Sequence, residues 1–319
     1  MSIQSGINTV QFKSQGCQLS GLLFTPNDFD ANKKYPTVVF AGPLNQIKEQ
    51  MGSFYGRKMV QKGFVYLTFD HFGYGDSEGM PRNAELVAPK TEGIRDAISY
   101  LRTLPFVDRD KLYGIGGCAG SQHMTIVAAS DTRLKAYATV SGMMSHGYNY
   151  FVEMVGKDTF FQMLEGANEA RQREYETGKS EYFDIFGYDN LPEEHKVGNE
   201  GYDYYMTERA GAQTYPNFTN HTLTRVIEDV VTVNSSVHAP YLFNPYLGIV
   251  GAKALPGEAP FPFDTGRHTT HFYENVNAQK ELYIIEGASH VDLYDQEAYV
   301  DQAVDKIVEF FDNYGQQKS

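Results

Sequence analysis

Short apolar runs recur along the first 140 residues and alternate with segments of helical periodicity. Residues 9–13 and 18–24 alternate apolar and polar positions around Ser14-Gln15-Gly16, which predicts an antiparallel hairpin. Continuous apolar runs predict strands that are buried on both faces at residues 35–41, 64–70, 111–116 and 134–140. Apolar residues at helical spacing predict helices between these strands, over residues 51–62, 91–104 and 121–129. This order predicts an α/β fold with a mostly parallel sheet flanked by helices and an antiparallel N-terminal edge.

The alternation stops at residues 145–238, a segment rich in Tyr, Glu, Asn and Met without the pattern of a buried strand. Strands resume at residues 246–250 and 281–285, and an amphipathic helix is predicted at 297–311. We therefore predict one α/β core, residues 1–144 and 239–319, which is interrupted by a largely helical lid at residues 145–238.

Composition narrows the classes of partner. The 319 residues include 27 Lys and Arg against 40 Asp and Glu, and this net charge of −13 speaks against nucleic acid as a partner. No apolar run approaches the roughly 18 residues of a membrane span, and the first residues lack a signal-peptide pattern. Two cysteines exclude a disulfide framework, and no metal-binding or P-loop motif occurs. We expect a cytoplasmic protein that acts on a small molecule without metal or cofactor, and homo-oligomerisation is left open.

The segment Gly116-Gly117-Cys118-Ala119-Gly120 joins a predicted strand to a predicted helix in the form G-x-C-x-G. So tight a turn lifts its central side chain clear of the sheet, and glycines flank it because a Cβ would clash there. The following helix directs its N-terminal N–H groups at the thiol, which is expected to lower the thiol pKa. Cys118 is therefore the predicted nucleophile, whereas Cys17 in the hairpin is interpreted as a packing residue.

Two other interpretations of this turn remain open. Residues 114–119 also fit the dinucleotide-binding pattern G-x-G-x-x-G/A, which would indicate a nicotinamide-dependent oxidoreductase. A buried, inert cysteine at the same place would indicate a non-catalytic binding protein.

With this turn, the chain resembles the α/β-hydrolase superfamily, in particular dienelactone-hydrolase-like enzymes in which cysteine replaces serine. It is also similar to fungal polyketide transferases. The likeness extends to Lys48-Glu49-Gln50, to Phe69-Asp70 with the glycine-rich turn 75–79, and to residues 281–295. The resemblance implies an esterase-like hydrolase that acts on an ester, lactone or thioester through an acyl-enzyme. Acyl transfer or carbon–carbon hydrolysis on polyketide-like substrates is the alternative within the fold.

The remaining members of a Cys-His-acid triad follow in the order nucleophile, acid, histidine. His290 lies on the loop after the last predicted strand and is the predicted base. Asp264 is the predicted acid if the Pro- and Gly-rich stretch before it is an inserted loop, and Glu258 is the alternative. The N–H groups of Ala119 and Leu44 are the predicted oxyanion hole.

Overall fold

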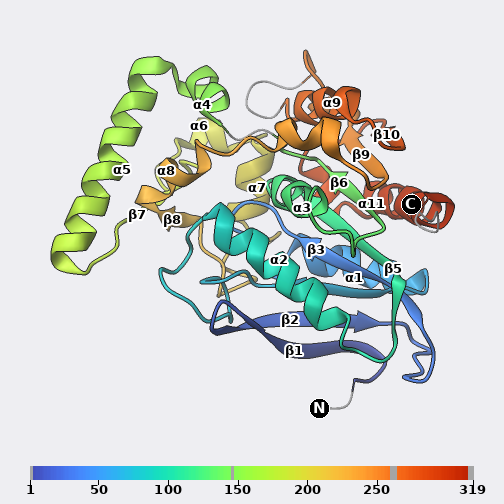
Figure 1. The fold of residues 1–319 in the computed structure, drawn as a ribbon. Coiled ribbons are helices and arrows are strands. Elements are labelled where there is room, and N and C mark those ends of the chain that lie inside the picture. Colours follow the sequence, from blue (N-terminus) through green and yellow to red (C-terminus); the bar gives the residue numbers. More distant parts are fainter. Residues whose placement is uncertain (1–2, 145–146, 259–263, 315–319) are drawn as a thin grey trace.

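Eight strands form one sheet in the computed structural model of the protein, which describes residues 3–144, 147–258 and 264–314 (Figure 1). The strands of this sheet are β1 (Gly6–Ser14), β2 (Cys17–Thr25), β3 (Tyr35–Ala41), β4 (Val65–Phe69), β5 (Val107–Gly117), β6 (Ala136–Val140), β9 (Tyr246–Gly251) and β10 (Lys280–Ile285). Their spatial order is β1-β2-β4-β3-β5-β6-β9-β10. The pairs β1–β2 and β2–β4 are antiparallel, and all other pairs are parallel. The predicted sheet and its antiparallel edge are therefore confirmed.

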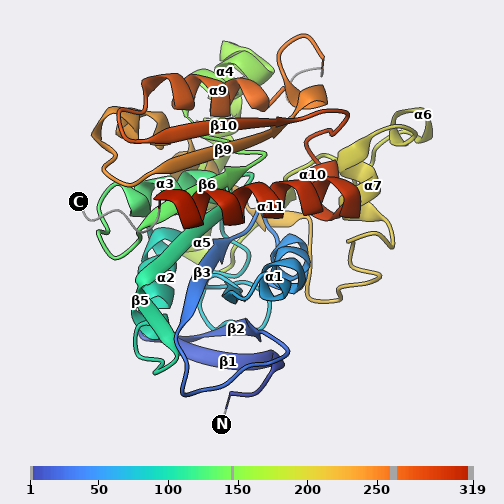
Figure 2. The ribbon, with the colours of Figure 1, turned by 90° about the vertical axis from the view of Figure 1, so that its right-hand side faces the viewer.

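Helices cover both faces of the sheet (Figures 1 and 2). One face packs against α1 (Met51–Gln61), α10 (Asp292–Asp295) and α11 (Glu297–Tyr314), and the other against α2 (Val87–Leu101), α3 (Gly120–Ala128) and α9 (Gly266–Asn275). The helix α2 begins four residues earlier than the periodicity predicts, since Val87 and Lys90 are buried as well. No helix among the described residues is both long and apolar enough to cross a membrane.

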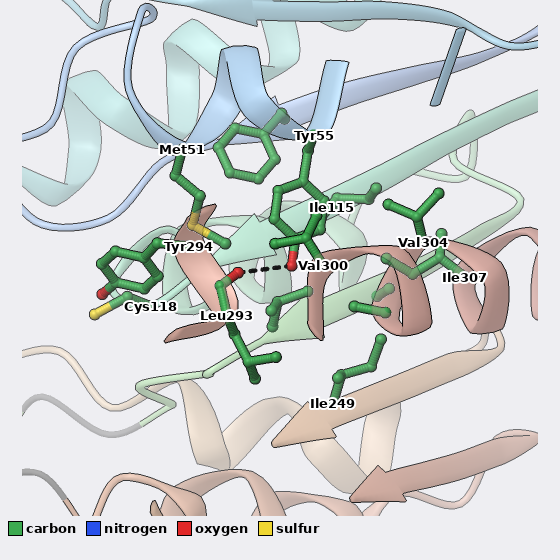
Figure 3. Close-up of a cluster of buried hydrophobic side chains, with 14 of the residues drawn as sticks. Met51, Tyr55, Ile115, Cys118, Ile249, Leu293, Tyr294, Val300, Val304 and Ile307 are labelled. Carbon is green, nitrogen blue, oxygen red and sulfur yellow. Dashed lines mark hydrogen bonds between the residues drawn. The ribbon is translucent and has the colours of Figure 1, made fainter. Parts of the chain in front are cut away.

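The strand side chains divide between two hydrophobic cores. Along β3, Val38 and Phe40 point into the core under α1 and α11, whereas Val39 and Ala41 point into the core under α2 and α3. A central strand has side chains buried on both faces of the sheet, which explains its uninterrupted apolar sequence. Figure 3 shows the first core, where side chains of α1 and α11 meet over the sheet: Met51, Tyr55, Val300, Val304 and Ile307.

Between β6 and β9 the chain leaves the large sheet. This segment contains α4 (Tyr148–Val155), α5 (Lys157–Thr177), β7 (Tyr182–Asp184), α6 (Glu193–Lys196), α7 (Glu200–Met206), β8 (His221–Leu223), the 3-10 turns Thr224–Val226 and Ser235–Tyr241, and α8 (Ile227–Val230). The antiparallel pair β7–β8 was not expected, because strands of three residues are too short to show alternation. Figure 1 shows α5 lying at the far side of this segment from the sheet. We refer to residues 147–238 as the cap.

Candidate active site

The turn after β5 has the geometry that its glycines predict. Cys118 has a φ of 46°, in the left-handed region, between the end of β5 and the start of α3. A Cβ on Gly116 would lie 2.5 Å from the Cα of Ser121, and a Cβ on Gly120 would lie 2.1 Å from the carbonyl oxygen of Ala41. Neither position can hold a side chain unless the backbone moves, so the tight turn depends on both glycines.

Three groups close to the thiol of Cys118 favour its thiolate form. They are the hydroxyl of Tyr294 and the backbone N–H groups of Ala119 and Leu44. Burial nevertheless dominates, because the side chain is only 5 % exposed, and it raises the pKa of Cys118 to about 11. The expectation of a lowered thiol pKa is therefore wrong: desolvation of the thiolate outweighs the N–H groups that favour it. At neutral pH the residue is a thiol.

His290 stands on the loop after β10 and is also buried. Its Nε2 lies 2.9 Å from the hydroxyl of Tyr294, and its Nδ1 lies 2.5 Å from Oγ1 of Thr265. The hydroxyl of Ser141, at the end of β6, donates to the backbone carbonyl of His290 at 2.8 Å and holds the loop in place. Burial lowers the pKa of His290 to about 4, so the imidazole is neutral at pH 7.

The predicted acids do not contact this histidine. Asp264 lies beside Thr265 in sequence, but its carboxylate pairs with Nε of Arg267 at 3.4 Å, and Thr265 occupies the position at Nδ1 where the acid was expected. Arg267 is in the first turn of α9 and also forms an ion pair with Glu153. Glu258 is exposed in the turn before residues 259–263, which lie outside the described part of the chain.

Cys118, His290 and Tyr294 line one cavity of about 280 Å³. The wall opposite them comes from the cap and is dominated by apolar and aromatic side chains, among them Tyr150, Phe151, Met154, Phe183, Phe186, Tyr188, Tyr205, Val226, Ile227 and Val230. Such a lining suits an apolar ligand and excludes much of the water from the sulfur.

Glu85 is a charged group in this wall that sequence patterns did not single out. Its Oε1 accepts hydrogen bonds from the backbone N–H of Asn45 at 2.7 Å, the hydroxyl of Tyr74 at 2.9 Å and Nζ of Lys90 at 2.5 Å. Burial opposes its ionisation, but Lys90, His123 and the N–H of Asn45 hold the pKa of the carboxyl below its ordinary value. Because Asn45 follows Leu44, the Glu85 carboxylate fixes the loop that presents the Leu44 N–H.

The sequence analysis also did not identify Tyr294 and Thr265 as candidates for the site. Tyr294 is only four residues beyond His290, and this closeness in the sequence is the signal that could have found it. Thr265 gave no such signal, since a hydroxyl next to an acidic residue is typical of many helix starts.

The structure does not support the dinucleotide-binding interpretation of residues 114–119. Gly114 and Gly116 lie inside β5 and pair on both sides, with Val39 and Ala41 of β3 and with Tyr137 and Thr139 of β6. They therefore form no turn that could cradle a pyrophosphate. Within the described residues, no group of three or more His, Cys, Asp or Glu side chains is placed to hold a metal ion.

Comparisons with known proteins agree with this architecture, although no protein-family model matches the chain. The uncharacterized protein YcjY of Escherichia coli K12 is 29 % identical over 301 residues, which cover 92 % of this chain and 94 % of that protein. The acyltransferase drtE of Aspergillus calidoustus is 25 % identical and covers 89 % of this chain and 88 % of its own length.

Solved structures give the same result. The crystal structure of the hypothetical protein PA2218 from Pseudomonas aeruginosa has a TM-score of 0.82 and 27 % identity, covering 98 % of this chain and 96 % of that one. The α/β hydrolase GrgF from Penicillium sp. sh18 has a TM-score of 0.77 and 18 % identity, covering 98 % and 99 %. The dienelactone hydrolase of Anabaena variabilis has a TM-score of 0.56 and 13 % identity, covering 98 % and 99 %. The sheet order, the helices on both faces and these neighbours together identify the chain as an α/β-hydrolase-fold protein.

Proposed function

We propose that this protein is an acyl-transfer enzyme in which Cys118 is the nucleophile and His290 the general base. One observation carries the proposal: two backbone N–H groups, from Leu44 and Ala119, converge on the sulfur of Cys118 inside an apolar cavity that also contains His290. A carbonyl group attacked by that sulfur would place its oxygen near the same donors. The N–H groups of Leu44 and Ala119 are therefore the proposed oxyanion hole.

The proposed reaction has two halves. The thiol of Cys118 loses a proton and Nε2 of His290 gains one while the sulfur attacks the substrate carbonyl carbon. The tetrahedral oxyanion is stabilised by the two N–H groups, and it collapses as the leaving alkoxide or thiolate takes the proton back from His290. Water or an acceptor hydroxyl then attacks the thioester carbon, and the same histidine accepts its proton. The second tetrahedral intermediate collapses as its bond to the sulfur of Cys118 breaks, the sulfur takes the proton back from His290, and the acid or new ester leaves.

The resting pair is a neutral thiol and a neutral imidazole. Because burial disfavours both charged forms, the thiolate–imidazolium ion pair does not form before the substrate binds. Removal of the proton must accompany the attack on the carbonyl. A neutral thiol reacts slowly with electrophiles other than the bound substrate. Catalysis therefore depends more strongly on proton removal by the general base than it does in an enzyme with a preformed thiolate.

The substrate class follows from the cavity wall. Aromatic and aliphatic side chains of the cap favour an ester, lactone or thioester with an apolar acyl group. We propose that residues 145–238 act as a lid, since side chains between Tyr150 and Val230 supply most of the cavity wall. Acyl transfer to an acceptor other than water is the second candidate, and it is favoured by the likeness to the acyltransferase drtE.

The test is acylation of the protein by p-nitrophenyl butyrate in a single turnover. We expect release of p-nitrophenol together with one added acyl group on the peptide that contains Cys118. The variant Cys118→Ala should lose both, whereas the matched control Cys17→Ala should keep both, because Cys17 lies in the hairpin β1–β2. Adding alcohol acceptors and measuring the ratio of ester to acid then distinguishes transfer from hydrolysis. Full activity in Cys118→Ala would contradict the proposal and leave the non-catalytic interpretation of this cysteine.

A further inference from the structure

Tyr294 occupies the space between the proposed nucleophile and the proposed base. Its hydroxyl lies 2.9 Å from Nε2 of His290, and it is close enough to the thiol of Cys118 for each of the two groups to shift the pKa of the other. Figure 3 shows the hydroxyl of Tyr294 beside that sulfur. Among the described residues, the side-chain partner of His290 Nε2 is thus Tyr294 and not Cys118.

We propose that Tyr294 is the proton relay of this site, an inference that rests on the proposed roles of Cys118 and His290. In the acylation step, the Cys118 S–H bond breaks as the tyrosine oxygen takes its proton. The Tyr294 O–H bond breaks at the same time as Nε2 of His290 takes the phenolic proton. The sulfur keeps its electron pair for the attack, the tyrosine ends neutral, and the imidazole ends protonated. The reverse transfer delivers a proton to the leaving group.

The surroundings of Tyr294 suit this role. The side chain is 1 % exposed, and burial holds its pKa well above the ordinary value, so the hydroxyl keeps a proton and can donate and accept at once. Thr265 at Nδ1 fixes the ring of His290. With the Nδ1 proton donated to Thr265, Nε2 is free to accept from Tyr294. The titratable groups that face Tyr294 are Cys118, His290, Tyr204 and Tyr205.

A purely structural role makes a different prediction. Tyr55 provides the matched control, because it is a buried tyrosine in the same core whose hydroxyl donates to the backbone carbonyl of Leu293 at 2.8 Å (Figure 3). Tyr55 thus supports α10, the helical turn to which Tyr294 belongs. The variant Tyr55→Phe therefore removes one buried phenolic hydrogen bond from this turn without touching the sulfur or the histidine.

The experiment measures single-turnover acylation by p-nitrophenyl butyrate as a function of pH and of the deuterium content of the solvent. For the wild type we expect a curved proton inventory, which indicates two protons in motion. In Tyr294→Phe we expect the acylation rate to fall by about 10²–10⁴-fold, the usual contribution of a positioned proton-transfer group, and the curvature to disappear. In Tyr55→Phe the rate and the inventory should stay as in the wild type, with at most a lower Tm.

A wild-type rate in Tyr294→Phe, or a faster one, would overturn the relay and assign Tyr294 to packing or to blocking the sulfur. A linear inventory in the wild type would overturn it even if Tyr294→Phe did not fold. Failure of the proposed function would give a different result from failure of the relay, because acylation would then persist in Cys118→Ala. Abolished acylation in Cys118→Ala with unchanged acylation in Tyr294→Phe would reject the relay alone.

Discussion

The hydrogen bond between His290 and Thr265 is the residue-scale feature that most alters the expected triad. A carboxylate at Nδ1 would stabilise the imidazolium that forms during catalysis, whereas a hydroxyl can orient the ring but brings no charge. Nothing within the described residues offsets the desolvation of His290, and its pKa falls to about 4. A base of such low pKa removes a proton only in concert with the attack on the carbonyl.

This arrangement predicts that Thr265 matters more than Asp264. We expect Thr265→Val to lower the acylation rate by about 10–10²-fold, because the ring loses the partner that sets its tautomer and orientation. Asp264→Asn should cost less than threefold, since its carboxylate pairs with Arg267. Both variants are compared on the same ester, with circular dichroism as the check on folding. A larger loss in Asp264→Asn than in Thr265→Val would restore Asp264 as the triad acid.

At the scale of elements, the unit of β5, the Cys118 turn and α3 packs directly against the loop after β3. The backbone of Gly120, at the start of α3, lies against the carbonyl groups of Ala41 and Gly42, just before the proposed oxyanion donor Leu44. Glu85 holds the same loop from the other side through Asn45, whose φ of 58° is in the left-handed region. The loop is thus defined by packing on one side and by a buried charge on the other.

Gly120→Ala tests this dependence. The added methyl would lie 2.1 Å from the carbonyl oxygen of Ala41, so we expect the loop to shift, unfolding stability to fall by about 1–3 kcal/mol and acylation to slow by more than tenfold. The matched control is Gly166→Ala in α5, where a Cβ meets nothing within 4 Å. That change should stabilise the protein by about 0.5–1 kcal/mol and leave acylation unchanged. Equal effects of the two substitutions on acylation would contradict the packing argument.

At the scale of the whole molecule, burial of neutral histidines makes stability depend on pH. Burial lowers the pKa of His290 to about 4. It also lowers the pKa of His71 well below the ordinary value, and within the described residues neither ring nitrogen of His71 has a hydrogen-bond partner. Below about pH 6.5 the unfolded chain binds protons that the folded protein does not. The free energy of unfolding is therefore expected to fall as the pH drops from about 6.5 toward 4.

Each such histidine contributes roughly 1.4 kcal/mol per pH unit in that range. Urea unfolding at pH 7, 6 and 5 measures the slope. The variant His71→Phe keeps an aromatic ring beside Phe69 and leaves the other titrating groups unchanged. It should reduce the slope of the unfolding free energy against pH by the contribution of one histidine. If the wild type and His71→Phe have parallel curves, His71 does not titrate as its burial implies.

The sequence by itself determined the succession of strands and helices along the chain, the mostly parallel sheet with its antiparallel edge, the tight turn around Cys118 and the place of His290 after the last strand. These features depend on local causes: the period of apolar positions, the steric demands of glycine, and the rule that parallel strands end at one edge. Each can be recognised from a few neighbouring residues. The boundaries of α2 and the short strands of the cap could not, because they depend on burial against other elements.

Only the tertiary structure decided the chemical state of the site. The pKa of Cys118 depends on how completely the cap removes water from its sulfur, and a helix N-terminus seen in sequence carries no information on that. Whether Asp264 or Thr265 reaches Nδ1 depends on the pairing of Asp264 with Arg267 in α9. The contact between Glu85 and the loop at Asn45 spans 40 residues of chain. Desolvation and long-range hydrogen bonds are properties of the packed molecule, because they require distant segments to exclude water from the same place.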